Sequence, residues 1–150
     1  MFEFNNKKWI KIVFLIISIF TIVRSVIHIV SLDGGASSIA GIPLSAYSQE
    51  ASQTIIFMFA LWGISQLIIG LFYLYVFVLK QDLIPLMLLS LTSEYSLRLI
   101  IGQLKPIITV HTAPGAYGNY IMIPLSIILF LYSIKKQLKV VSLNHYILHH

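Results

Sequence analysis

Residues 83–105 read LIPLMLLSLTSEYSLRLIIGQLK, a run that is apolar enough to cross a bilayer and yet carries two charges inside it. Glu94 and Arg98 are four residues apart, so a helix places them on the same face. A charge at bilayer depth costs at least about 2.5–3.5 kcal/mol on insertion scales. Such side chains therefore face the interior of a membrane protein, where they find partners, and this pair predicts an intramembrane site.

The composition of the whole chain is that of a membrane protein. Of its 150 residues 58% are hydrophobic and only 10% are charged, and the mean hydropathy is +0.91, whereas soluble domains are about a quarter charged. Cysteine is absent, which excludes disulfides, thiolate catalysis and cysteine-ligated metals. The formal net charge of +5 does not indicate nucleic acid as a partner, because the basic residues flank apolar runs and form no surface stripe.

The chain contains four apolar segments, of which residues 83–105 contribute the third, and each is expected to be a transmembrane helix. The fold class is therefore all-α, a single four-helix transmembrane domain with a basic tail over residues 135–150. The first segment has a basic leader like that of a signal peptide, but it carries Arg24 and His28, which favours a retained helix. In the second, Gly63 and Gly70 are seven residues apart, a spacing that lets a neighbouring helix approach closely. The expected spans are 9–30, 54–79, 83–102 and 116–134.

The basic residues predict how these helices are oriented. The positive-inside rule places both termini in the cytoplasm of a multi-pass protein of the cell membrane. The long loops after segments one and three then face outward, and the first of them, residues 31–53, is either a lid over the bundle or an ordinary connection. Of the ten Lys and Arg residues, seven lie at the termini or between segments two and three: Lys7, Lys8, Lys11, Lys80, Lys135, Lys136 and Lys139.

In this topology polar residues of all four segments fall at similar depths. At about 1.5 Å of rise per residue, Arg24, Trp62 and Glu94 lie roughly 12–13 Å below the outer ends of their helices. An outward-facing polar pocket follows, with Lys105 and His111 at its rim. The candidate ligand-binding residues are Arg24, His28, Trp62, Gln66, Glu94, Arg98 and Asn119.

Two interpretations of this cluster are open. In the first, Arg24–Glu94 and Glu94–Arg98 are buried ion pairs that only fix the register of the helices. In the second, the excess of positive charge binds a small amphipathic guest of the lipid, quinone or isoprenoid type, because Arg suits bidentate contact with a carboxylate or phosphate. The sequence specifies no cofactor.

Alternative functions also remain open. Glu94 with His28 could move a proton in a membrane isomerase, although no nucleophile motif, HExxH or glycine-rich phosphate loop is present, so whether the chain is an enzyme stays undecided. Metal binding through His28, Glu94 and His111, or through His145, His149 and His150 in the tail, is not expected. An accessory subunit of a larger membrane complex is suggested by the lack of a catalytic motif and by an aromatic stripe on segment two that we expect to be exposed: Trp62, Gln66, Gly70, Tyr73 and Phe77. A homo-oligomer is a further possibility.

Several short motifs over residues 20–134 resemble the DoxX-like group of small four-helix bacterial membrane proteins. They are Arg24, Asp33-Gly34-Gly35-Ala36, Gly63, Gly70, and Arg98 followed by Lys105-Pro106. The resemblance implies a four-helix bundle of the bacterial inner membrane with an intramembrane polar cluster. Some members of the group are described as subunits or partners of quinone-linked oxidoreductases, and the wider group includes lipid-handling proteins. Many carry an acidic residue in the last helix, whereas segment four here has none.

Overall fold

The computed structural model of this protein describes residues 7–148, with side chains described as far as Ile134. In that part of the chain the structure is all-α and contains no strand. Each of the four long helices is long and apolar enough to cross a membrane, so the protein is a multi-pass membrane protein with the predicted four-helix fold. The elements are α1 (Lys8–Val30), η1 (Leu44–Ala46), α2 (Gln49–Leu79), η2 (Gln81–Leu83), α3 (Ile84–Leu104) and α4 (Pro114–Leu148).

Two helices extend more than two residues beyond the predicted spans, whereas α1 and α3 match theirs to within two residues. α2 begins at Gln49 and not at residue 54, because the side chain of Ser48 accepts a hydrogen bond from the Ala51 N–H at 3.3 Å and caps the helix. Its 31 residues are roughly 46 Å long, which exceeds the ~30 Å of a hydrocarbon core. α4 likewise continues into the predicted tail as far as Leu148. The histidines at 149 and 150 lie outside the described residues.

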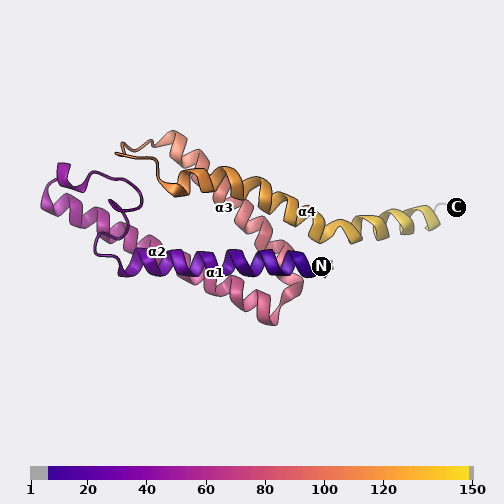
Figure 1. Ribbon diagram of the computed structural model, residues 1–150. Coiled ribbons are helices and arrows are strands. Elements are labelled where there is room, and N and C mark those ends of the chain that lie inside the picture. The colour runs from indigo at the N-terminus through magenta and orange to yellow at the C-terminus, as the bar shows by residue number, and fades with distance from the viewer. Residues whose placement is uncertain (1–6, 149–150) are drawn as a thin grey trace.

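The four long helices form two hairpins, in which α1 packs along α2 and α3 packs along α4 (Figure 1). The loops over residues 31–48 and 105–113 lie together at one end of the molecule, which we call the loop end. The start of α1 and the η2 turn lie at the opposite end, which we call the closed end. The last turns of α4 project beyond the closed end (Figure 1).

The hydrophobic core lies toward the closed end. There the ring of Trp9 on α1 packs edge-on against Tyr132 on α4, with centroids 5.7 Å apart, and Phe14 contacts Tyr73 at the same centroid distance. The Trp9–Tyr132 contact joins the two hairpins at the surface, and the buried core residues, which come from all four long helices, hold the hairpins together beneath it. The buried core residues are Ile10, Phe14, Ile17, Tyr73, Val76, Ile84, Met87, Leu88, Leu91, Tyr95 and Leu129.

The stripe on α2 that we expected to be an exposed docking surface is instead the face that α2 turns toward the protein. Gln66, Gly70 and Tyr73 are buried, Phe77 is partly buried against the core, and Trp62 is half-buried. The expectation of an exposed stripe was therefore wrong. Because α2 is apolar on all sides, its hydrophobic pattern does not distinguish the face that meets protein from the face that meets lipid.

The two glycines of α2 allow α1 to approach closely, as their spacing predicted. A Cβ atom at Gly63 would lie 3.1 Å from the carbonyl oxygen of Ser25, and one at Gly70 would lie 2.8 Å from Cγ1 of Ile22. Neither position has room for a side chain unless α1 moves. On α3, by contrast, a Cβ atom at Gly102 would meet nothing within 4 Å.

We expect Gly70→Val to lower the free energy of unfolding by about 1–3 kcal/mol, the range for overpacked interior positions. The measurement is an SDS titration of the purified protein in mixed micelles, followed by circular dichroism. Gly102→Val is the matched control, since it makes the same change at an exposed helical position, and it should stay within about 0.5 kcal/mol of the parent. Equal losses at the two positions would contradict a role for Gly70 in helix approach.

Candidate functional site

A cavity of about 790 Å³ lies between the two hairpins on the side of the loop end. All four long helices and both long loops contribute to its wall, which is largely apolar and aromatic. Its volume is in the range of about 300–1,000 Å³ that is usual for small-molecule sites. The helices that meet at the closed end therefore separate enough at the loop end to enclose a ligand-sized space.

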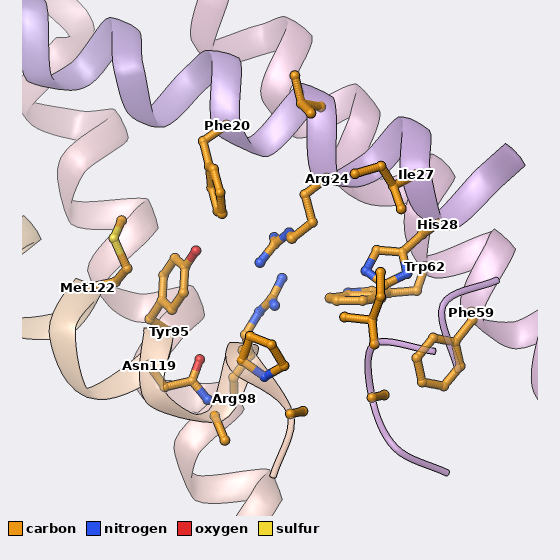
Figure 2. Close-up of a pocket in the computed structure, with 18 of the residues that line it drawn as sticks. Phe20, Arg24, Ile27, His28, Phe59, Trp62, Tyr95, Arg98, Asn119 and Met122 are labelled. Carbon is orange, nitrogen blue, oxygen red and sulfur yellow. The ribbon is translucent and has the colours of Figure 1, made fainter. Parts of the chain in front are cut away.

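The structure brings the predicted site residues together at this cavity. Five of the seven line it, namely Arg24, His28, Trp62, Arg98 and Asn119. Figure 2 shows the guanidinium groups of Arg24 and Arg98 pointing toward each other in the middle of the cavity, with Trp62 and His28 on one side and Tyr95 on the other. The remaining two predicted residues, Gln66 and Glu94, do not line the cavity, but they hydrogen-bond to these arginines.

Four polar side chains from three helices form a connected series, which we call the polar relay. Arg24 Nη2 on α1 donates to Gln66 Oε1 on α2 at 2.8 Å. Gln66 Nε2 in turn donates to Glu94 Oε1 on α3 at 2.9 Å, and the same oxygen forms an ion pair with Arg98 one turn further along α3. The predicted contact between Glu94 and an arginine is thus present. Arg24, however, reaches the carboxylate through the amide of Gln66.

The polar relay holds more positive charge than negative charge. It contains two guanidinium groups and one carboxylate, and no Asp or Glu is among the residues that line the cavity. Arg24 Nε is buried without a hydrogen-bond partner, although guanidinium groups seek partners for all five of their N–H groups. Both guanidinium groups lie over the indole of Trp62, with Cζ atoms 5.4 Å (Arg24) and 4.9 Å (Arg98) from the ring centroid. This cation–π contact stabilises the charges but supplies no counter-ion.

His28 is fixed by the first loop. Its ring is buried and lies 4.7 Å from the ring of Trp62 between centroids, and Nδ1 is 2.7 Å from the carbonyl oxygen of Gly34. Because a carbonyl oxygen only accepts hydrogen bonds, Nδ1 carries the proton, and in the neutral ring Nε2 keeps its lone pair. Gly34 and Gly35 both have positive φ, of 60° and 75°, a conformation in which glycine is least strained.

The carboxylate of Asp33 shapes the turn that holds His28. It accepts hydrogen bonds from the backbone N–H groups of Gly35, Ser37 and Ser38 at 2.7–3.1 Å. Partial burial of the carboxylate opposes its ionisation, but these donors outweigh that effect and hold the pKa of Asp33 below its ordinary value. The carboxylate therefore stays charged at neutral pH and keeps the turn closed.

The two long loops meet above the cavity. The Val110 N–H donates to the carbonyl oxygen of Gly41 at 2.8 Å, and Ile39 and Ala40, which precede Gly41, line the cavity. Of the two ideas for the first loop, the structure supports the lid. The predicted rim residues Lys105 and His111 do not line the cavity.

Several cavity residues were missed in the sequence. Tyr95 on α3 and Phe20 on α1 line the cavity with the arginines, and the Tyr95 ring lies 5.4 Å from Arg98 Cζ. The spacing in the sequence could have indicated both residues. Phe20 precedes Arg24 by four residues and Tyr95 precedes Arg98 by three, which places each aromatic residue on the same helix face as its arginine. Met122 and the start of α4 at Pro114 also line the cavity, and no charge marks them in the sequence.

Among the described residues, no group of three His, Cys, Asp or Glu side chains is placed to hold a metal ion. In the same part of the chain, the hydrogen bonds of Glu94 go to Gln66 and Arg98, and that of His28 goes to Gly34. The geometry thus gives no direct link between the two residues considered for proton transfer.

Comparison of the chain with protein-family models, curated proteins and solved structures finds no match. The resemblance to the DoxX-like group therefore stays a prediction, and the function is argued from the geometry of the site.

We expect Glu94→Gln to lower the free energy of unfolding by about 3–5 kcal/mol, the range for removing one partner of a buried ion pair. The reason is that two guanidinium groups would remain in the bundle without a carboxylate. Gln66→Leu should cost less, because it disconnects Arg24 and leaves the Glu94–Arg98 pair intact. SDS titration measures both, with Ser93→Ala on the exposed side of α3 as the control. An unchanged stability of Glu94→Gln would contradict a buried relay.

Proposed function

We propose that this protein binds a small amphipathic molecule, with an anionic group, in the cavity between its two hairpins. The observation that carries the proposal is the excess positive charge of the polar relay at a ligand-sized apolar cavity. An uncompensated buried charge is costly, and an anionic group placed between Arg24 and Arg98 would remove that cost. The apolar wall would receive the rest of the ligand.

The chemistry of the cavity suits such a ligand in two further respects. Arg24 donates to Gln66 and Arg98 donates to Glu94, and each guanidinium group has five N–H donors, which leaves donors on both for the forked contacts that carboxylates and phosphates accept. The α4 helix begins at Pro114 on the cavity wall. Its N-terminus carries the positive end of the helix dipole, which adds to the attraction for an anion.

The orientation in the membrane is part of the proposal. Lys7, Lys8, Lys11 and Lys80 all lie at the closed end, and the positive-inside rule places that end in the cytoplasm of the cell membrane. Both termini are then cytoplasmic, since the chain crosses four times, and the cavity lies in the outer half of the bilayer.

Reporter fusions test this topology. We expect an alkaline phosphatase fusion after Ser38 to be active outside the cytoplasm and a green fluorescent protein fusion after Asn144 to fluoresce inside it. Each reporter should be silent when the two sites are exchanged, because the two positions are separated by the membrane. Reporters that place Ser38 and Asn144 on the same side would contradict four crossings.

The other functions have less support. The accessory-subunit proposal rested on an exposed aromatic stripe on α2, and in the structure that stripe faces the interior of the protein. The isomerase proposal needs Glu94 and His28 to act on one substrate, whereas Glu94 lies behind the cavity wall and is held by Arg98 and Gln66. The purely structural interpretation of the relay leaves the excess guanidinium charge unexplained.

Gly118→Leu tests ligand binding with little risk to the fold. Gly118 lines the cavity, and a Cβ atom there would meet nothing within 4 Å, so the leucine should fill the space and exclude the ligand. Native mass spectrometry of protein purified in mild detergent should find a bound small molecule on the parent and on Gly102→Leu, and none on Gly118→Leu.

Trp62 gives a second readout, because it lies in the cavity. In a Trp9→Phe background it is the sole tryptophan, and its fluorescence should differ between Gly118→Leu and Gly102→Leu. If no small molecule accompanies the parent and Trp62 fluorescence is identical in the two variants, the cavity binds nothing.

A further inference from the structure

Protein covers the cavity at both ends of the bundle but not along the side between α1 and α4. This difference determines the route by which a ligand can enter. Toward the loop end, Ile39 and Ala40 of the first loop lie on the cavity, and the bond between Val110 and Gly41 joins this loop to the second one. Toward the closed end, the buried core residues fill the bundle. The cavity is therefore covered at both ends of the bundle.

Between these two ends, α1 and α4 leave the cavity open toward the lipid. They are not a main packing pair of the bundle, since α1 packs on α2 and α4 packs on α3. Phe20 and Val23 of α1 and Ile121 of α4 line the cavity and are also 61%, 52% and 63% exposed. More than half of the surface of each of these cavity-lining side chains is exposed, so they border the open side of the cavity.

The depth of this opening decides what passes through it. All three bordering residues lie within the apolar spans Lys8–Val30 and Pro114–Ile134, and not in the loops. A molecule that enters here comes out of the hydrocarbon layer, and it meets apolar side chains before it meets the guanidinium groups. Figure 2 shows Phe20 and Met122 on the side of the guanidinium groups opposite to Trp62 and Phe59.

The charge of the relay limits the head group of the ligand. Two guanidinium groups and one carboxylate leave one positive charge, which one negative charge on the ligand would neutralise. A neutral head group would leave the charge uncompensated, and a dianion would leave a new negative charge buried; both are costly. Carboxylates and phosphodiesters carry one negative charge and accept forked contacts from Arg.

We propose that the ligand is a membrane lipid whose head group carries one negative charge, and that it enters sideways from the bilayer between α1 and α4. This inference rests on the proposed binding function and adds the ligand class and the route to it. The head group lies between Arg24 and Arg98, and the hydrocarbon tail extends past Phe20 and Ile121 toward the lipid.

The head group is tested with matched lipids. Purified protein in phosphatidylcholine nanodiscs is offered a photoactivatable long-chain fatty acid, the fatty alcohol of the same length, or phosphatidylglycerol with the same photoactivatable group. We expect the fatty acid or phosphatidylglycerol to label the cavity about tenfold or more above the alcohol, because only the charged head groups pair with the arginines. The lipid that labels more strongly identifies carboxylate or phosphodiester as the head group.

The Arg24→Gln variant tests the effect of the excess positive charge on lipid preference separately from any effect on folding. The variant removes the excess positive charge and keeps the Glu94–Arg98 pair, so it should remain folded in the SDS titration and label equally with the acid and the alcohol. A preference for the acid that persists in Arg24→Gln would overturn the assignment of the charge. Labelling of Gly118→Leu that equals that of the parent, for every lipid, would overturn the binding function itself.

The route is tested with crosslinks, for which a chain without cysteine is a clean background. Val23→Cys with Ile121→Cys places one thiol on each side of the opening. Bis(methanethiosulfonate) crosslinkers of increasing length join α1 to α4 there, because each end forms a reducible disulfide with one cysteine and releases methanesulfinate. Trp9→Cys with Tyr132→Cys joins the same helices at the closed end and is the matched control. Exchange of a preloaded fluorescent fatty acid with vesicles is then followed.

We expect the Val23–Ile121 crosslink to slow the exchange of the fatty acid about tenfold or more, and reduction of the crosslinker to restore it. The Trp9–Tyr132 crosslink should leave exchange unchanged. Exchange that is insensitive to the first crosslink, in protein that still binds the fatty acid, would overturn the lateral route and leave the binding function standing.

Discussion

The structure depends on one constraint: charged side chains in a hydrocarbon solvent must find their partners within the protein. Glu94 meets that constraint by taking Arg98 from its own helix and, through the amide of Gln66, Arg24 from α1. The relay therefore links α1, α2 and α3 within their apolar spans, where an unpaired charge is costly. With one carboxylate and two guanidinium groups, the relay carries a net positive charge. The cavity lies next to the two guanidinium groups.

The packing of the bundle explains why there is space for a cavity at that depth. Within each hairpin the helices are in close contact, and between α1 and α2 the approach is set by Gly63 and Gly70. Between the hairpins, buried side chains such as Phe14 of α1, Leu88 of α3 and Leu129 of α4 fill the closed end, whereas α2 and α3 pack little against each other elsewhere. The two hairpins pack together at the closed end and diverge toward the loop end. The polar relay lies where they begin to diverge.

The sequence predicted the number of helices, because an apolar run of bilayer length is typical of a transmembrane helix. It also indicated the charged residues of the polar relay, because a charge in such a run is costly and therefore rare. It also placed Trp62 near Arg24 and Glu94 by depth, and it indicated Gln66 because an amide in an apolar helix needs partners. Which face of α2 turns inward could not be read from a helix that is apolar on every side. The start of α2 depended on a cap at Ser48 that lies outside the apolar run. That Gln66 bridges Arg24 to Glu94 depends on side-chain length and helix spacing, neither of which is fixed by depth alone.

The backbone bond between Gly41 and Val110 has a mechanical consequence. Gly41 belongs to the loop of the α1–α2 hairpin, and Val110 belongs to the loop of the α3–α4 hairpin, so this bond fastens the hairpins to each other at the loop end, as Trp9 and Tyr132 do at the closed end. The space between α1 and α4 is then a slit that is pinned at both tips. In the proposed entry route, a slit of this kind would widen by bowing of its sides and could not lengthen, so the cross-section of a lipid would limit its entry and the length of its tail would not.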